Sequence, residues 1–133
     1  MYSIIEIYSN NEYKVRYISE DPSEIYKMYN VIDLFVLPSI GYEGFPNVII
    51  ESLTLNVPII STYYKSGLTE IILNGKGGDL IKNNNPSKIA KRILLFFSKK
   101  SFLMKKTILS QKKLQRFNYE IGRKNFQKII NNL

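Results

Sequence analysis

Two short runs of consecutive apolar residues limit most strongly what this chain can fold into. Residues 34–37 (Leu-Phe-Val-Leu) and 57–60 (Val-Pro-Ile-Ile) contain no polar or charged side chain. Strands buried on both faces have such sequences, because neither face has to meet water. The roughly 20 residues between the two runs are enough for a helical crossover between parallel neighbours. We therefore expect two adjacent parallel strands joined by a helix over residues 46–55, with Pro46 at its favoured first position.

Local signals indicate further helices and strands. Residues 21–24 (Asp-Pro-Ser-Glu) and 85–86 (Asn-Pro) each combine a capping side chain with a proline that begins a helix. The second of these helices would present an apolar stripe at helical spacing: Ile89, Ile93, Phe96 and Phe97. Apolar positions recur again from Tyr119 to Leu133, and strands are expected over 14–18 and 78–81. The alternation predicts an α/β fold with helices on a mostly parallel sheet, which becomes all-helical near the C-terminus.

The composition excludes several kinds of chemistry. The 133 residues include no Cys and no His, so there is no thiol nucleophile, Cys/His zinc site, disulfide or His-dependent triad. Asp occurs only at positions 21, 33 and 79, so no Asp-x-Asp pair is present to hold a metal–diphosphate complex. We expect a single domain without a metal site.

The charge is divided unevenly along the chain. Residues 1–81 carry 5 basic and 10 acidic residues, whereas residues 82–133 carry 14 basic residues and only Glu120, which together make the net charge of +8. A basic C-terminal third is compatible with nucleic acid, an anionic membrane surface or phosphate-bearing substrates. The excess of Ile, Lys, Asn and Tyr is also typical of an AT-rich genome, in which case the lysines have no functional meaning.

Signals for membrane insertion or export are lacking in the sequence. No segment reaches the roughly 18–20 apolar residues that span a bilayer. The first residues have no basic region of the kind that opens a signal peptide. We therefore expect a cytoplasmic protein.

The loop after the first apolar run is the most informative segment. It follows a predicted parallel strand, at the place where open α/β sheets bind ligands. Gly41 and Gly44 let the backbone turn tightly and approach a ligand. The helix that follows would direct the N–H groups of Asn47, Val48 and Ile49 outward. Such a helix N-terminus is a seat for a diphosphate.

Two glutamates flank this helix start. Glu43 lies in the loop, and Glu51 lies about one and a half turns into the helix. A carboxylate accepts two hydrogen bonds, which suits the vicinal hydroxyls of a ribose or hexose. Paired glutamates also occur in retaining glycosidases, where they face each other across one bond. A loop residue and a helix residue would more naturally line an elongated ligand.

At this point the chain resembles a known family. Glu43 and Glu51 with seven residues between them, preceded by Leu-Pro-Ser at 37–39 and containing Gly-Phe-Pro at 44–46, look like the signature of family 4 retaining glycosyltransferases. Those enzymes have the GT-B fold of two Rossmann-like domains and use nucleotide-sugar donors. Other blocks match in the same order: residues 33–39, 56–62, 66–72, 74–81 and 117–120.

The resemblance implies roles for individual residues. Glu43 would be the catalytic residue that contacts the donor sugar, and Glu51 would bind the ribose hydroxyls. Backbone groups of four residues would place the sugar and the pyrophosphate: Gly44, Phe45, Asn47 and Val48. By the same resemblance, the sugar would move with retained configuration from a nucleotide-diphosphate sugar, a UDP-linked donor, with neither a cofactor nor a metal.

The resemblance also implies how much of an enzyme is present. Residues 1–133 would form a single truncated nucleotide-sugar-binding domain, a partial C-terminal GT-B domain whose Rossmann-like parallel sheet is flanked by helices and which ends in helices. The N-terminal acceptor domain would be missing, along with the Arg and Lys that usually neutralise the diphosphate. We therefore expect this chain alone to be inactive.

Three functions remain open at this stage. The first is the donor half of a hexosyltransferase-type enzyme of bacterial surface polysaccharide synthesis. It would act on a glycan or polyprenyl-linked acceptor at the cytoplasmic face of the plasma membrane, with peripheral contact to anionic lipid. The second is a basic module that binds nucleic acid or a membrane surface. The third is an inactive gene fragment.

Overall fold

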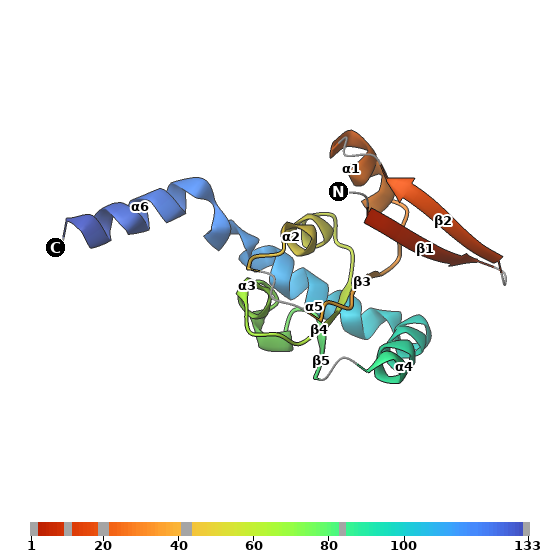
Figure 1. Cartoon of the computed structure of the whole chain (residues 1–133). Coiled ribbons are helices and arrows are strands. Elements are labelled where there is room, and N and C mark those ends of the chain that lie inside the picture. Colours follow the sequence, from red (N-terminus) through yellow and green to blue (C-terminus); the bar gives the residue numbers. More distant parts are fainter. Residues whose placement is uncertain (1–2, 10–11, 19–21, 41–43, 83–84, 132–133) are drawn as a thin grey trace. The chain divides into compact units, whose positions relative to one another are not determined.

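A computed structural model describes residues 3–9, 12–18, 22–40, 44–82 and 85–131 of the chain (Figure 1). The chain divides into two compact units, Met1–Ile32 and Asp33–Leu133. The candidate site identified from the sequence belongs to the second unit.

The first unit consists of a β-hairpin and one helix. Strand β1 (Ser3–Ser9) pairs antiparallel with β2 (Glu12–Ile18), and helix α1 spans Pro22–Tyr29. These bounds confirm the strand predicted over 14–18 and the helix that begins at Pro22. The hairpin partner β1 was not predicted. The hairpin forms a separate sheet rather than joining the parallel one, because antiparallel neighbours can be connected by a short loop without a crossover.

The second unit is built on a three-stranded parallel sheet in the order β3–β4–β5. Its strands are β3 (Phe35–Leu37), β4 (Ile59–Thr62) and β5 (Asp79–Ile81). Every residue of the central strand β4 is buried, whereas β3 is only half-buried. The expectation that residues 34–37 are buried on both faces is therefore wrong, because β3 is an outer strand of this sheet in the described part of the chain.

Strand β4 is displaced by two residues from the predicted run at 57–60. It starts after Pro58, which has no N–H to donate to a ladder, and it continues through two polar residues. Their hydroxyls are satisfied by the end of the neighbouring strand: Ser61 Oγ donates to the carbonyl of Leu37 at 3.0 Å, and Thr62 Oγ1 donates to that of Ser39 at 2.6 Å. Because both hydroxyls have acceptors, they can be buried without an unpaired polar group.

Helices cover both faces of this sheet (Figure 1). On one face, α2 (Asn47–Thr54) and α3 (Gly67–Ile71) contribute to a core formed by Ile49, Leu53, Ile59, Leu68, Ile71 and Ile72. On the other face, α4 (Pro86–Ser98) contributes to a core formed by Ile60, Ile81, Phe96 and Leu103. The consecutive residues Ile59 and Ile60 belong to different cores because side chains alternate along a strand. The predicted α/β fold, a partial Rossmann-like sheet flanked by helices, is confirmed.

The chain after α4 is helical, as predicted. Helix α5 (Lys100–Lys113) is followed by the short 3-10 helix η2 (Leu114–Phe117) and by α6 (Tyr119–Ile130). Another short 3-10 helix, η1 (Leu73–Gly75), lies between α3 and β5. Within α4, Phe96 is buried but Phe97 is exposed, so the prediction that Phe97 shares the inward stripe is wrong. Each described residue of α6 is also exposed.

Helix α5 approaches the η1–β5 connection closely. The Nζ of Lys106 donates to the carbonyls of Gly75 at 3.0 Å and Gly78 at 3.2 Å. A Cβ added at Gly77 would lie 1.6 Å from Ser110 Oγ. The close approach therefore requires a glycine at this position.

Helix α2 ends in a Schellman motif that turns the chain toward β4. Asn56 adopts a left-handed φ of 59°. Its N–H donates to the carbonyl of Leu53 at 3.1 Å, and the N–H of Val57 donates to that of Ser52 at 2.8 Å. Asn tolerates this conformation better than most residues, and both bonds satisfy carbonyls at the helix end. The predicted helix over 46–55 is thus observed over 47–54, with Pro46 as its N-cap rather than its first residue.

Candidate functional site

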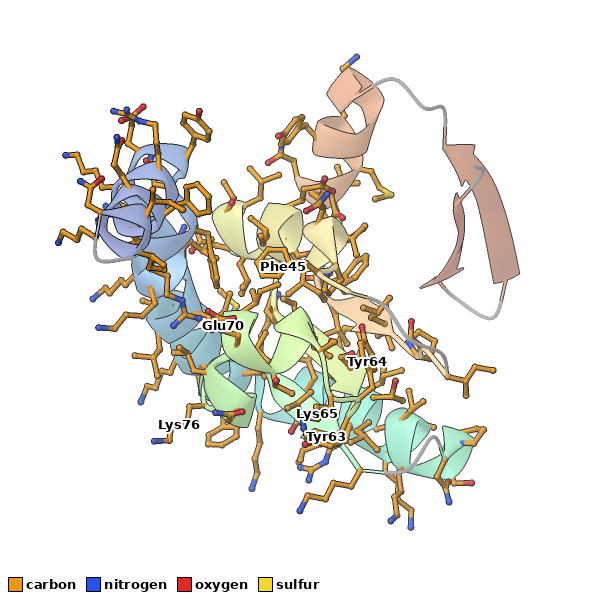
Figure 2. All side chains as sticks on the ribbon, turned by 60° about the vertical axis from the view of Figure 1, so that its left-hand side comes forward. Phe45, Tyr63, Tyr64, Lys65, Glu70 and Lys76 are labelled. Atoms are coloured by element: carbon orange, nitrogen blue, oxygen red, sulfur yellow. The ribbon has the colours of Figure 1, made fainter. Side chains whose placement is uncertain are left out.

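The candidate site lies at the carboxyl edge of the parallel sheet. The connections leaving β3 and β4 both begin at this edge and lead to α2 and α3, because the strands are parallel. Figure 2 labels residues from these connections, with Phe45 just before α2 and Tyr63, Tyr64 and Lys65 after β4. Open parallel sheets bind their ligands at this edge.

The N-terminus of α2 opens at this edge without a capping side chain. Its N-cap, Pro46, makes no side-chain hydrogen bond, and the first turn contains no acidic residue. Asn47 is exposed and Val48 is half-buried. The N–H of Ile49 donates to the carbonyl of Pro46 at 3.1 Å, so the prediction that this amide also points outward is wrong. The N–H of Ile49 forms a hydrogen bond within the first turn of the helix instead.

Glu51 lies on the same side of α2 as Asn47, one turn further along. Residues four apart are neighbours on a helix surface. The buried residues Ile49, Ser52 and Leu53 face the other way, toward the core. Glu51 is half-buried. The structure therefore places Asn47 and Glu51 on one face of α2.

Two of the residues singled out in the loop, Gly41 and the candidate catalytic residue Glu43, lie outside the described residues. The arrangement of Glu43 relative to Glu51 therefore stays a prediction.

Gly44 is hydrogen-bonded to Gly67, the first residue of α3. The N–H of Gly67 donates to the carbonyl of Gly44 at 2.8 Å. A Cβ added at Gly67 would lie 2.2 Å from Cδ2 of Phe45 and 3.0 Å from the carbonyl oxygen of Gly44. The absence of a side chain at Gly67 lets the loop approach α3 closely, and the hydrogen bond holds it there. The bond thus connects the segment that follows β3 with the segment that follows β4.

The ring of Phe45 also contacts η2. It meets Phe117 edge-to-face, with 5.2 Å between ring centroids and 73° between the planes. The guanidinium of Arg116 lies 4.6 Å from the Phe117 centroid and donates to the backbone carbonyl of Glu70. Edge-to-face and cation–π contacts contribute stability beyond the buried area of the rings. Residues far apart in sequence thus hold the end of the loop in place.

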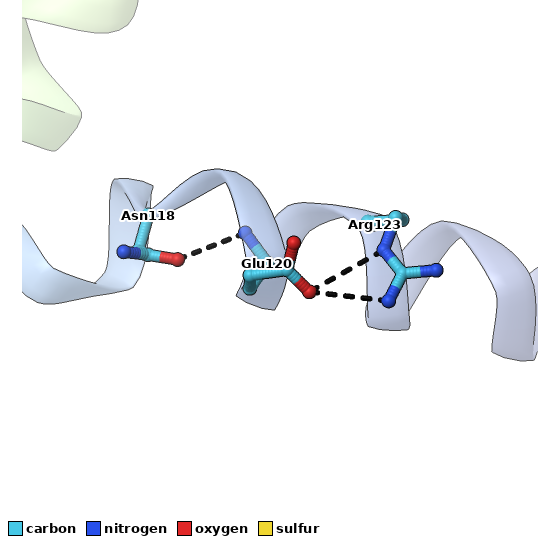
Figure 3. A network of polar contacts seen from close by, with 3 residues as sticks. All are labelled: Asn118, Glu120 and Arg123. Atoms are coloured by element: carbon cyan, nitrogen blue, oxygen red, sulfur yellow. Dashed lines mark hydrogen bonds and ion pairs between the residues drawn. The ribbon is translucent and has the colours of Figure 1, made fainter.

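An open hollow of about 580 Å³ adjoins Phe45. Its lining residues come from the loop, η2 and the first part of α6: Phe45, Arg116, Phe117, Asn118, Tyr119, Gly122, Arg123 and Phe126. Figure 3 shows how this part of α6 is organised: Asn118 Oδ1 accepts from the N–H of Glu120 at 2.8 Å, and Glu120 pairs with Arg123 at 3.1 Å. The cap and the ion pair fix the start of α6 beside the hollow.

Sequence reasoning missed several residues at this edge. It gave Phe45 a role through its backbone alone and gave none to Gly67 or to the Arg116–Phe117 pair. It also overlooked Lys65 and Lys82, exposed cations that follow β4 and β5 at the carboxyl edge. A search for basic residues in the segment directly after each predicted strand would have found these lysines.

Two negative findings apply to the described residues. Among them, no three His, Cys, Asp or Glu side chains gather as a metal-ligand set. No helix in the same part of the chain has the length and apolarity needed to cross a membrane.

The fold and the edge geometry define the class of the chain as an α/β protein with an open parallel sheet whose carboxyl edge is arranged around a helix N-terminus. The family model described as glycosyl transferases group 1 matches residues 6–118, and the chain belongs to this family.

Relatives with curated names support the same assignment. Over 78 residues the chain is 33% identical to WcaL of Salmonella typhimurium, which is named as a colanic acid biosynthesis glycosyltransferase; the match covers 55% of this chain and 19% of that protein. Over 71 residues it is 35% identical to the capsular polysaccharide biosynthesis glycosyltransferase CapM of Staphylococcus aureus, covering 53% of this chain and 18% of that protein. The matches span about a fifth of the length of these relatives.

Proposed function

We propose that this chain supplies the donor-binding part of a retaining, hexosyltransferase-type glycosyltransferase and binds a nucleotide-diphosphate sugar at the start of α2. The observation that carries the proposal is the uncapped N-terminus of α2 at the carboxyl edge of the sheet, with Asn47 and Glu51 on one helix face. A helix N-terminus without a capping side chain or an acidic first turn favours an anion such as a diphosphate.

Each part of the donor then has a partner. The amides of Asn47 and Val48 bind the pyrophosphate, and Glu51 accepts hydrogen bonds from the ribose hydroxyls. Backbone groups of Gly44 and Phe45 place the sugar, which Glu43 contacts through its hydroxyls. The cations after β4 and β5 add positive potential at the same edge, which lowers the free energy of a bound diphosphate.

The reaction relies on positioning and on stabilising the leaving group. The bond between the anomeric carbon and the phosphate oxygen of the UDP-linked donor breaks. The acceptor hydroxyl attacks the anomeric carbon from the same face and gives its proton to the leaving diphosphate, so that the anomeric configuration is retained. Helix amides aimed at the diphosphate stabilise the charge that develops as it leaves. Neither a metal nor a cofactor is required by this scheme.

The names of the relatives support a proposal for the acceptor. Their roles in colanic acid and capsular polysaccharide biosynthesis favour a glycan or polyprenyl-linked acceptor in bacterial surface polysaccharide synthesis, handled at the cytoplasmic side of the membrane. We propose that residues 1–133 act as one nucleotide-sugar-binding domain, that acceptor binding belongs to a separate N-terminal domain, and that this chain alone does not transfer sugar.

Calorimetric titration of the purified chain with UDP-glucose and with UDP tests donor binding. We expect saturable binding of both ligands. Glu51→Gln should weaken it about tenfold, because charge-assisted hydrogen bonds to the ribose are lost. Glu70→Gln is the matched control: this exposed glutamate lies on α3, and its replacement should leave the affinity unchanged. Absence of saturable binding to any nucleotide-diphosphate sugar, or equal effects of the two substitutions, would contradict the proposal.

A further inference from the structure

The hollow beside Phe45 is lined by side chains that the proposed donor site does not use. Its volume of about 580 Å³ lies within the range that small-ligand sites occupy, about 300–1,000 Å³. Three aromatic residues of its lining are open to solvent: Phe45 is 43% exposed, Tyr119 77% and Phe126 66%. The hollow therefore offers several aromatic rings to a ligand.

One face of α6 forms a wall of the hollow. Tyr119, Gly122, Arg123 and Phe126 line the hollow, and they follow one another at the spacing that places residues on one helix face. They belong to the recurring pattern that the sequence shows from Tyr119 onward, yet each of them is exposed. Within the described part of the chain, this face of α6 therefore stays open to solvent.

Gly122 leaves space in this wall. A Cβ added at this position would meet no atom of the described residues within 4 Å. Packing among those residues therefore does not require a glycine here. Glycine is also, after proline, the least favourable residue in the interior of a helix. Space for a ligand accounts for a glycine at this position, whereas a close contact between helices does not.

Two arginines bring hydrogen-bond donors to the hollow. Arg116 lies over the ring of Phe117 and donates to the backbone carbonyl of Glu70. Arg123 is held by its ion pair with Glu120 (Figure 3). Among the described residues, Arg116 donates through one nitrogen atom and Arg123 through two, whereas a guanidinium carries five N–H donors. Both groups are thus held in place and can also donate to a ligand.

The proposed donor site determines which part of the reaction lies next to the hollow. Glu51 binds the ribose one turn into α2, and the amides at the start of that helix bind the diphosphate. The sugar follows at Phe45, whose ring lines the hollow. Because the acceptor approaches the sugar from the end that is not joined to the nucleotide, the hollow lies on the acceptor side of the donor.

We propose that this hollow binds sugar units of the acceptor glycan, next to the unit that receives the transferred sugar. The inference rests on the proposed function, from which it takes the direction of the donor. One face of a sugar ring presents C–H groups, which pack on aromatic faces such as those of Tyr119 and Phe126. The hydroxyls of the sugar accept hydrogen bonds from Arg116 and Arg123. The reacting unit itself is bound by the separate acceptor domain.

The mixed lining of the hollow favours a glycan over a polyprenyl chain. A polyprenyl chain is apolar throughout, so it would cover the guanidinium groups of Arg116 and Arg123 without offering them an acceptor. Burial of a charged donor without an acceptor is costly. A sugar ring satisfies both the aromatic and the charged part of the lining.

Saturation-transfer NMR on the full chain, with UDP present, tests the proposal. The probes are maltotetraose, chitotetraose and a tetramer of galacturonic acid. We expect saturable binding of at least one of them, and Phe126→Ala should weaken it about tenfold because one stacked ring is lost. Phe97→Ala is the matched control, since Phe97 is 64% exposed but lies on α4. This control should stay within about twofold of the parent chain.

Gly122→Leu separates ligand binding from a structural role. The leucine side chain would occupy the hollow, so oligosaccharide binding should fall at least about tenfold. The helicity seen by far-UV circular dichroism should stay equal or rise, because leucine favours a helix more than glycine does. Gly122→Ala, which fills little of the hollow, should retain oligosaccharide binding. Both variants should bind UDP within about twofold of the parent chain.

Three results would overturn the proposal. They are absence of binding of all three oligosaccharides while UDP binds, equal losses in Phe126→Ala and Phe97→Ala, and sedimentation of the parent chain as a dimer that Gly122→Leu dissociates. The last result would assign the hollow to a second copy of the chain. Absence of UDP binding by the parent chain would instead overturn the proposed function, and with it the acceptor side assigned to the hollow.

Discussion

At the scale of single residues, the contact between Gly67 and the Gly44–Phe45 loop matters most for the candidate site. Gly67 supplies an N–H to the loop and leaves space for the ring of Phe45. Neither property depends on the residue's immediate sequence neighbours. The shape of the loop is therefore determined by a residue more than twenty positions further along the chain.

We predict that Gly67→Ala lowers the free energy of unfolding by about 1–3 kcal/mol, because its Cβ would overlap the Phe45 ring and force a shift in a packed region. Urea denaturation monitored by circular dichroism measures this change. In a Phe45→Ala background the same substitution should cost less, because two of the three atoms nearest to the new Cβ, both carbons of the Phe45 ring, are absent and the Gly44 carbonyl at 3.0 Å remains.

Gly44→Ala is the control for this pair. A Cβ at Gly44 meets no atom of the described residues within 4 Å, so the effect of Gly44→Ala on stability should stay within about 0.5 kcal/mol. A cost of Gly67→Ala that is equal in the two Phe45 backgrounds would refute the proposed overlap.

At the scale of elements, the residue at which a helix begins is determined by neighbouring residues in the sequence. Which side of the helix is buried is determined by the elements that pack against it. Asn85 and Asn118 each accept a hydrogen bond from the first turn of the helix that follows, at 3.2 and 2.8 Å. The sequence predicted the first of these caps from the Asn-Pro pair. It did not predict that Phe97 turns outward, because a position at the border of a helical stripe is buried or exposed according to what packs beside it.

We predict that Asn118→Ala reduces the helicity of α6, because the cap contributes about 1 kcal/mol to a helix that buries none of its described side chains. Amide hydrogen exchange across residues 119–130 should show faster exchange, with little change in β4. Asn125→Ala, an exposed substitution inside the same helix, should act in the opposite direction because Ala has the higher helix propensity. Equal effects of the two changes on α6 would contradict the capping role.

At the scale of the whole molecule, the core cluster around Ile59 and the core cluster around Ile60 are formed, among the described residues, by residues from Asp33 onward. Both sides of the parallel sheet are covered by helices of the second unit. These two clusters therefore contribute hydrophobic stabilisation from within residues 33–133.

We predict that a chain of residues 33–133 unfolds cooperatively, with a urea midpoint close to that of the transition assigned to this unit in the full chain. Tyrosine fluorescence and circular dichroism should report coincident transitions. Gradual unfolding without a cooperative transition would show that residues 1–32 are needed for the stability of the sheet.

How much of the fold and of the candidate site could be predicted from the sequence depends on how far apart in the chain the residues that determine each feature lie. The apolar runs, the Pro46 turn and the Asn-Pro start of α4 are short-range patterns, and they predicted the β3–α2–β4 unit and the later helices. The partial burial of β3 and the two-residue displacement of β4 were not predictable, since both depend on which strand lies beside which. The hairpin partner β1 was missed for a related reason: its pairing is antiparallel, outside the expected sheet.

By itself, then, the sequence determined the α/β class, the position of the α2 N-terminus and the placement of Glu51 one turn beyond Asn47. Each of these follows from bonding or periodicity within a few residues. Tertiary structure alone decided that Gly67, Arg116 and Phe117 support the loop at Phe45. It also decided that Lys106 of α5 donates to the backbone carbonyls before β5. Those contacts join residues far apart in the chain, and they form only when burial of the shared core brings their elements together.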